Sequence, residues 1–381
     1  MNTSKKIIIK LVKQMLKGFC IFPIQRDRIV FSAYSGRQYS CNPKYISEYL
    51  LENYGEDIEV IWAFNKPEMF SNLDGRIKKV KFKSLKYIYD VMTAAVVVDN
   101  VEGWSILPKR RNQLVLNTWH GGGAYKGVGL QRRDTDTNLD KNMLEKHKRV
   151  SVYLSSSRAF SKMTLRDSFG YKGKILECGM PRNDLLLKGN TSDLQSNIRK
   201  KIGCDREHLL IYAPTFRNDE NYRASIDYER LLGSVKKRFG GEWKILFRGH
   251  YYDESERVYN EQIIDVTMYP DMQELLLISD ILVTDYSSSM WDFSLTGKPC
   301  FLYADDLASY KDERAFYTPV SSWPFSMAET NDELERNILR FNSECYADAI
   351  EEHHRKLQIK ETGEASKIAG KLIFAYLKKL K

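Results

Sequence analysis

The chain has 381 residues, which is too long for one ordinary folding core and suits two domains of about 150–200 residues. Apolar residues make up 43% and aromatic residues 12%, which excludes a disordered protein, and no run approaches the roughly 20 apolar residues that a membrane-spanning helix needs. The net charge of +9, from 59 Lys and Arg against 50 Asp and Glu, leaves three kinds of partner: nucleic acid, an anionic membrane or an anionic substrate.

The six cysteines are scattered along the chain, and none forms a C-x-x-C pair. This spacing argues against a zinc site and against a disulfide framework, and it favours a reducing cytosol. We expect no metal as a fixed cofactor, because no His and Cys residues have ligand spacing. A Mg²⁺ ion carried in on a nucleotide stays open.

Residues 1–24 are predicted to form a basic amphipathic helix. Apolar residues recur at positions 7, 8, 11, 12, 15, 16 and 19, with lysines on the other side. Such a helix can lie in the plane of an anionic membrane, and the alternative is a helix docked on its own domain. The lysines interrupt the apolar run, so it is not a secretory signal.

The rest of the chain alternates short apolar runs with segments of helical spacing. Many of the runs are continuous, as in parallel strands that are covered on both faces. We therefore predict an α/β fold of two Rossmann-like domains with parallel sheets, divided near residues 186–196 into 25–190 and 191–381, with a cleft between them. The expected strands are Arg28–Ala33, Glu59–Ala63, Ile77–Phe82, Ala95–Asp99, Leu114–Thr118, Val152–Ser155, Ile175–Glu177, Leu209–Ala213, Lys244–Phe247, Ile263–Asp265, Ile281–Thr284 and Cys300–Tyr303.

The first candidate site follows the strand Leu114–Thr118, where Trp119 and His120 precede three glycines. Ligands of parallel sheets bind beyond the carboxyl ends of the strands, and a histidine titrates near neutrality, so His120 can take a proton from a hydroxyl. The alternative is a turn histidine that bonds to a nearby carbonyl. An esterase oxyanion loop is unsupported because no G-x-S-x-G elbow exists, and G-x-G-x-x-G is not satisfied either.

Two further clusters follow strands of the second domain. Thr215 and Arg217 come after Leu209–Ala213, and Arg248 and His250 come after Lys244–Phe247. Arginine offers a planar fork for phosphate oxygens, and a histidine beside it suits an anion-stabilising role. The alternatives are a surface arginine and a capping histidine.

The most informative segment is Ser279–Trp291, a strand that empties into a turn with three serines. A helix N-terminus behind such a turn offers unpaired N–H groups, and Asp285, Ser287 and Ser288 are expected to bind an anion such as a phosphate. The alternative is a plain helix N-cap. Arg182 and Asn183, after the strand Ile175–Glu177, are expected to close the cleft or form a hinge. The four remaining histidines are expected to be solvated: His147, His208, His353 and His354.

Taken together, the motifs resemble the CDP-glycerol glycerophosphotransferase family of teichoic acid primases and polymerases. The segment from Phe31 to Leu50 is similar to the N-terminal region of that family too, so the resemblance covers roughly residues 28–320. Departures from the family pattern are the third serine, Ser289, the neighbouring Trp291, and the extended glycine run Gly122-Gly123. The motifs that carry the resemblance are Asn117–Gly121, Gly179–Asp184, Tyr212–Arg217, Arg248–His250 and Ser279–Ser288, with Phe293 and Lys298-Pro299.

The resemblance implies a GT-B-like enzyme on the cytoplasmic face of a bacterial membrane, attached peripherally. It would transfer glycerol phosphate from CDP-glycerol to a hydroxyl of a polyprenyl-diphosphate-linked acceptor and release CMP. The first domain would bind the acceptor and the second the CDP-activated polyol. His120 and His250 would be catalytic, with His120 as the base. Phosphate binding is expected from Arg217, Arg248, Asp285, Ser287 and Ser288, and other cleft positions from Trp119, Gly121, Gly122, Thr215, Arg182 and Asn183.

Two alternatives share this fold: a CDP-ribitol-dependent transferase and a GT-B glycosyltransferase that uses a nucleotide sugar. A nucleic-acid-binding protein is disfavoured because the positive excess is not gathered into one stripe with interleaved aromatic residues. Product length, teichoic acid against capsule polymer, and oligomeric state stay open.

Overall fold

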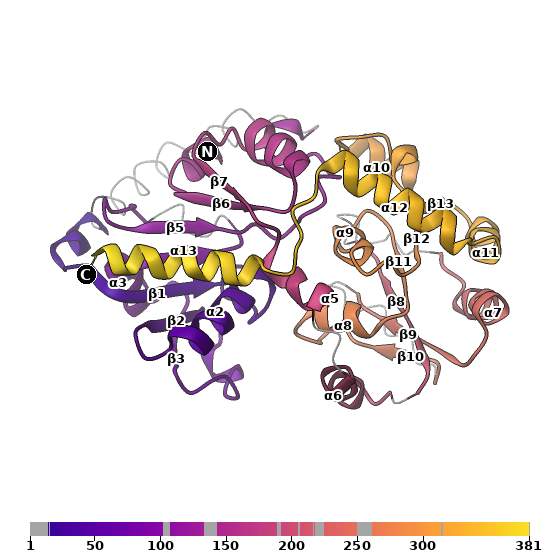
Figure 1. Cartoon of the computed structure of the whole chain (residues 1–381), viewed down its shortest axis with the longest axis horizontal. Helices are drawn as coiled ribbons and strands as arrows, with labels where there is room; N and C mark the ends of the chain where they lie inside the picture. The colour runs from indigo at the N-terminus through magenta and orange to yellow at the C-terminus, as the bar shows by residue number, and fades with distance from the viewer. Residues whose placement is uncertain are drawn as a thin grey trace.

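Two parallel sheets organise the part of the chain that the structure describes. The computed structural model describes residue 14 and residues 16–101, 107–132, 143–188, 192–204, 206–215, 217, 225–249, 261–313 and 315–380. Figure 1 shows the two sheets next to each other, each with helices packed around it. The predicted α/β fold with parallel sheets is confirmed.

The first sheet has the strand order β3-β2-β1-β4-β5-β6-β7, and all of its neighbouring strands run parallel. The order reverses direction between β1 and β4, so the loops after these two strands diverge and leave room for a ligand. β4 is buried along its whole length, which explains its unbroken apolar sequence. The strands are β1 (Gln25–Ser32), β2 (Glu59–Phe64), β3 (Ile77–Lys81), β4 (Ala94–Asp99), β5 (Leu114–Asn117), β6 (Val152–Ser155) and β7 (Lys174–Glu177).

The second sheet has the order β10-β9-β8-β11-β12-β13, again all parallel. Its direction reverses between β8 and β11, which are the strands that lead to the Thr215 loop and to the serine turn. The strands are β8 (His208–Ala213), β9 (Trp243–Phe247), β10 (Ile263–Asp265), β11 (Ile281–Thr284), β12 (Cys300–Tyr303) and β13 (Ser326–Ala328).

Helices cover both sheets, and several short turns connect them (Figure 1). The α-helices are α2 (Cys41–Tyr54), α3 (Leu85–Thr93), α5 (Asp184–Lys188), α6 (Ser192–Ile202), α7 (Tyr228–Phe239), α8 (Met272–Ile278), α9 (Ser289–Ser294), α10 (Leu307–Glu313), α11 (Asn331–Leu339), α12 (Ser343–Leu357) and α13 (Ala365–Leu380). The others are the 3₁₀ turns η1 (Lys17–Ile21), η2 (Pro67–Met69), η3 (Gly129–Gln131), η5 (Pro181–Asn183) and η6 (Val320–Ser322), and the π-helix η4 (Phe160–Ser168).

Every strand expected from the sequence is present, with ends that move by at most a few residues. Among the strands of the described residues, β13 alone was not predicted. Its three residues, Ser-Met-Ala, carry no β-branched side chain and no alternation, and the strand forms because β12 offers it a parallel partner.

The predicted N-terminal helix over residues 1–24 lies mostly outside the described residues. Its described end forms the turn η1, and Arg110 binds the carbonyl oxygens of Cys20 and Phe22 at 3.0 and 2.7 Å. None of the described helices combines the length and apolarity needed to cross a bilayer.

The position of the C-terminal helix α13 differs from the predicted domain division, which placed residues 191–381 in one domain. It returns to the first sheet, where Ala365, Ala369, Ile373 and Leu377 join the core formed by β1, β4 and α2. Figure 1 shows α13, in yellow, lying along the first sheet. The local helical pattern predicts the apolar face of α13 but not the sheet that covers it.

An ionic contact joins the two halves beside the cleft. Lys44 of α2 binds Asp271 at 2.6 Å and Glu274 of α8 at 3.0 Å, and the Tyr45 hydroxyl donates to Asp271 at 2.8 Å. The Asp271 side chain is only 1% exposed. Burial, with the nearby charges of Asp271 and Glu274, raises the pKa of Glu48 to about 7, although Lys44 opposes this shift.

The packing of α13 generates the first prediction. Ile373→Ala should lower the free energy of unfolding by about 2–5 kcal/mol, because it truncates a fully buried side chain in the core between α13 and the first sheet. Ile368→Ala on the same helix is the control, since Ile368 is 37% exposed and should change stability little. Urea titration measures both. Equal effects of the two substitutions would show that α13 does not pack on the first sheet in solution.

Candidate active site

His120 is held in one tautomer by the end of the neighbouring strand. Its Nδ1 lies 3.0 Å from the carbonyl oxygen of Asn100, directly after β4. Because a carbonyl can only accept, Nδ1 carries the proton and the neutral ring has its lone pair on Nε2. The Asn100 side chain also accepts the N–H of Tyr34 at 2.8 Å, so one residue fixes the loops after β1 and β5. Asn100 was not among the expected site residues, although it is a polar residue directly after a predicted strand.

The backbone before His120 is constrained. Trp119 has a left-handed φ of +52°, a conformation that costs energy in any residue with a Cβ. Hydrogen bonds maintain it: the Asn117 side chain accepts the Trp119 N–H at 2.8 Å, and the Asn42 side chain donates to the Trp119 carbonyl at 3.0 Å. The indole ring lies 4.4 Å from the His120 ring and meets Phe169 edge-on.

The glycine run lets this loop pack closely on α9. A Cβ on Gly122 would lie 2.8 Å from the indole ring of Trp291, and one on Gly123 would lie 2.8 Å from the Trp291 Cβ. Gly121 is different, because its nearest neighbours, Ser288 and Trp119, would be 3.7 Å away. The departures from the family pattern at Gly122-Gly123 and Trp291 are therefore connected: Gly122 makes room for the Trp291 indole, and Gly123 makes room for the Tyr125 ring and the Trp291 Cβ.

A cavity of about 190 Å³ lies between the two halves and brings His120 to Ser288. Its walls come from the His120 loop, from the π-helix η4 and from the serine turn. The sequence predicted part of the lining and missed the rest, because Lys126, Phe160 and Thr164 belong to no recognisable motif and Tyr286, although it lies in the serine turn, was not expected to face a ligand. The lining residues are Trp119, His120, Gly121, Gly123, Ala124, Tyr125, Lys126, Val128, Phe160, Thr164, Tyr286 and Ser288.

Asp285 was expected to contact a phosphate, but in the structure its carboxylate binds two neighbouring loops. It is 3% exposed, and its carboxylate accepts the N–H and hydroxyl of Thr215 and the N–H of Tyr286. A carboxylate cannot donate a hydrogen bond to a phosphate. Asp285 thus connects the Thr215 loop, which follows β8, to the serine turn, which follows β11. Thr215, an expected cleft residue, is one of its hydrogen-bond partners.

The serine turn presents Ser288 to the cavity. Ser287 is engaged inside the turn, where its hydroxyl oxygen accepts from the Ser289 N–H at 3.3 Å and from the Ser289 hydroxyl at 3.0 Å. Ser288 stands at the N-cap of α9 and makes no side-chain cap bond. The helix behind it has only six residues, and the N–H groups of Met290 and Trp291 bind the carbonyl oxygens of Ser287 and Ser288 within the turn, which leaves the Ser288 hydroxyl as the group that faces the cavity.

Arg217 is surrounded by carboxylates and rings. It binds Asp306 through Nε and Nη2 at 2.5 and 3.0 Å and Asp285 through Nη1 at 2.9 Å. Its guanidinium carbon lies 5.1 Å from the Tyr286 ring and 4.8 Å from the Tyr310 ring. The guanidinium is therefore fixed beside Tyr286, which lines the cavity, with much of its charge balanced.

Arg248 follows β9, and only backbone oxygens hold its guanidinium among the described contacts. Nη1 donates to the carbonyl of Tyr269 at 2.9 Å and more weakly to that of Val266 at 3.4 Å. Burial lowers the pKa of Arg248, and the charges of Asp271 and Tyr34 partly oppose this shift. A desolvated cation of this kind favours an incoming anion. The second predicted catalytic residue, His250, lies outside the described residues.

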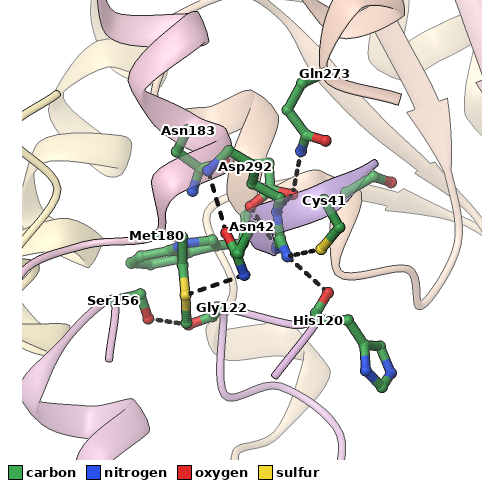
Figure 2. Close-up of polar contacts among 12 residues, drawn as sticks. Cys41, Asn42, His120, Gly122, Ser156, Met180, Asn183, Gln273 and Asp292 are labelled. Carbon is green, nitrogen blue, oxygen red and sulfur yellow. Dashed lines mark hydrogen bonds and ion pairs between the residues drawn. The ribbon is translucent and has the colours of Figure 1, made fainter. Parts of the chain in front are cut away.

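Arg182 and Asn183 do not line the cavity, in contrast to their predicted place. Both are buried in η5. Arg182 pairs with Asp292 of α9, and the Asn183 amide donates to Glu361 at 3.1 Å. Figure 2 shows this polar cluster, with the His120 ring turned away from it and the His120 carbonyl directed towards it.

Three of the four histidines expected to be solvated are packed against other side chains. His147 is 1% exposed and stacks on Phe169. His353 lies 2.9 Å from the Tyr125 hydroxyl, and burial lowers its pKa to about 4. His354 contacts the Ser294 hydroxyl at 2.8 Å. These three histidines face the interior, although the charged residues next to them in the sequence had indicated a solvent-exposed face.

Within the described residues, no three His, Cys, Asp or Glu side chains gather as metal ligands would. The polar donors described so far around the cavity and its neighbouring loops are hydroxyl and guanidinium groups.

The fold and this site define the class of protein. It is an α/β protein with two parallel sheets, and residues that follow strands of both sheets line its cavity. Residues 15–375 match the family described as CDP-Glycerol:Poly(glycerophosphate) glycerophosphotransferase, and the chain belongs to this family of CDP-glycerol-dependent transferases.

Relatives and solved structures agree with this assignment. The chain is 30% identical over 95% of its length to the teichoic acid poly(glycerol phosphate) polymerase of Bacillus spizizenii, of which the match covers 96%. It is 29% identical over 98% of its length to the teichoic acid glycerol-phosphate transferase of Staphylococcus aureus, of which 99% is covered. The solved structure of the wall teichoic acid polymerase TagF matches with a TM-score of 0.85 at 28% identity, covering 99% of this chain and 96% of that one.

Glu361 generates a pH prediction. It accepts from the Met180 N–H and the Asn183 amide, and burial raises its pKa to about 8, against these two hydrogen bonds. The folded chain therefore keeps a proton that the unfolded chain releases above its ordinary pKa of 4.5. Stability should fall between pH 5 and 8, by less than about 1.4 kcal/mol per pH unit, and Glu361→Gln should remove this fall.

Urea titrations at several pH values measure this effect as the difference between the wild type and the variant. Glu352→Gln is the control, because Glu352 on α12 pairs with Arg355 near the surface and its pKa is lowered. If the wild type and Glu361→Gln had parallel pH profiles, the Glu361 carboxyl would not titrate as the structure indicates.

Proposed function

We propose that the enzyme transfers glycerol phosphate from CDP-glycerol to a hydroxyl of a lipid-linked teichoic acid acceptor and releases CMP. The observation that supports this most directly is the tautomer of His120. His120, whose neutral form has its lone pair on Nε2, shares a cavity with Ser288, whose turn follows β11 of the second sheet. A base and a group suited to phosphate therefore meet across the cleft.

In the proposed reaction, His120 takes the proton of the acceptor hydroxyl. The hydroxyl oxygen forms a bond to the β-phosphorus of CDP-glycerol, and the bond from that phosphorus to the CMP oxygen breaks in line. Phosphoryl transfer of this kind depends on positioning and charge stabilisation more than on covalent help. The Asn100 carbonyl favours His120 as base, because it stabilises the protonated ring by accepting its Nδ1–H.

The second half would hold the diphosphate. The Ser288 hydroxyl offers a donor, and Arg248 offers a desolvated positive charge. Arg217 is proposed to act beside them, held in place by Asp285 and Asp306. His250 completes this set as a proposal that follows from the sequence motif alone.

The location of the enzyme is proposed from its acceptor and its sequence. A lipid-linked acceptor keeps the reaction at the cytoplasmic face of the membrane, and lysines of the N-terminal segment would bind anionic headgroups there. The teichoic acid names of the relatives favour that polymer over a capsule.

His120→Ala should lower the rate of CMP release by about 100-fold to 10,000-fold, the range that a lost general base costs. The control is His208→Ala. The His208 side chain is 54% exposed and lies at the amino end of β8, whereas the cavity lies beyond the carboxyl ends of the strands. Circular dichroism checks the fold. Turnover of His120→Ala close to wild type would remove His120 from the proposed role.

A donor panel tests the substrate. CMP release should be fastest with CDP-glycerol, slower with CDP-ribitol and absent with UDP- or GDP-sugars, each offered with a prenyl-diphosphate-linked acceptor. Preference for CDP-ribitol would change the polyol, and preference for a nucleotide sugar would replace the proposed reaction with glycosyl transfer. Mass spectrometry of the products then separates addition of one unit from polymerisation.

A further inference from the structure

One buried guanidinium connects the His120 loop to the helix of the serine turn. Arg182 binds both carboxylate oxygens of Asp292, with Nε to Oδ2 and Nη2 to Oδ1 each at 3.0 Å. The two side chains are 3% and 5% exposed and lie 110 residues apart in the sequence. This is the planar, two-point geometry in which arginine pairs best with a carboxylate.

The third nitrogen of the same guanidinium contacts the loop of the base. Nη1 of Arg182 donates to the carbonyl oxygen of His120 at 2.9 Å and to the sulfur of Cys41 at 3.4 Å. Asn42 supports the arrangement, because its side chain accepts the Arg182 N–H at 3.1 Å and donates to the Trp119 carbonyl. The consecutive carbonyls of Trp119 and His120 are thus held by one polar cluster.

Asp292 reaches into the other half of the site. It belongs to α9, which begins directly after Ser288, and it also accepts from the Gln273 amide of α8 at 3.0 Å. Burial alone would lower the pKa of Arg182, but the charge of Asp292 outweighs it and the pKa of Arg182 is raised, so the guanidinium stays charged. A shift of α9 relative to the His120 loop would break two charged hydrogen bonds in a desolvated place.

We infer that Arg182 and Asp292 form a positioning pair, which fixes the distance between the base His120 and the phosphate-binding turn at Ser288. This inference rests on the proposed function, since it gives the pair a part in that reaction. Neither side chain lines the cavity, so the pair acts through His120 and Ser288 and not on the substrate. The contact of Gly122 and Gly123 with Trp291 joins the same two segments by packing.

The test compares steady-state CMP release by the full-length wild type, Arg182→Lys and Asp292→Asn, together with calorimetric binding of CDP-glycerol. Lysine keeps the charge but not the fork that reaches Asp292 and His120 together. We expect kcat to fall about 100-fold in both variants, because a displacement of about 1 Å at a reacting group costs that much. The dissociation constant of CDP-glycerol should stay within about threefold of wild type, since uniform donor binding is not removed.

Arg158→Lys is the matched control. Arg158 pairs with Glu177 at 3.1 Å on the same half of the molecule, but its side chain is 67% exposed and has no contact with the His120 loop among the described bonds. This variant should keep its kcat. Thermal unfolding of all variants records any loss of the fold, and Asp292→Asn provides a second measurement if Arg182→Lys does not fold.

A wild-type kcat in Arg182→Lys or Asp292→Asn would overturn the inference. A fall in kcat with an equal loss of donor affinity would also overturn it, because it would show a general structural role. Failure of the wild type to release CMP from CDP-glycerol would instead overturn the proposed function, so the reference enzyme separates the two failures.

Discussion

The buried ion pair between Arg182 and Asp292 is the interaction on which the site depends. The proposed base, His120, lies on a loop of one sheet and the serine turn follows the other, and these two segments lie far apart in the sequence. Only contacts across the cleft can set their separation. A bidentate, desolvated pair suits this task, since its hydrogen bonds have fixed directions and lose much of their energy when either partner moves.

Apolar packing acts together with this pair. The glycines after His120 allow the loop to approach the Trp291 indole to van der Waals distance, which side chains at Gly122 and Gly123 would prevent. On the outer side of the interface, Lys44 binds Asp271 and Glu274. Three contacts between the two halves therefore surround the cavity that His120 and Ser288 line. They are the buried pair of Arg182 and Asp292, the packing of Trp291 on the two glycines, and the ionic contact of Lys44 with Asp271 and Glu274.

Local patterns were enough to predict most elements of this fold. Continuous apolar runs such as the one in β4 predicted parallel strands, and the rule that ligands bind beyond strand ends led to His120, to the Thr215 loop and to the serine turn. The same rule applied to Asp99-Asn100 would have found the residue that orients His120. What the patterns could not give was the partner of each polar group. Asp285 was expected to face phosphate but accepts from Thr215 and Tyr286, and Arg182 was expected in the cleft but is buried against Asp292.

The sequence by itself determined the fold class, the strands other than β13, the family and the strand end that carries His120. Each of these depends on periodicity or on motifs within about a dozen neighbouring residues, which a linear pattern records. The tertiary structure alone decided that α13 packs on the first sheet, that Arg182 joins the two halves, and that His147 and His353 are enclosed. These outcomes depend on which surfaces meet after folding, because burial and the choice of an ionic partner are properties of contacts between residues that lie far apart in the chain.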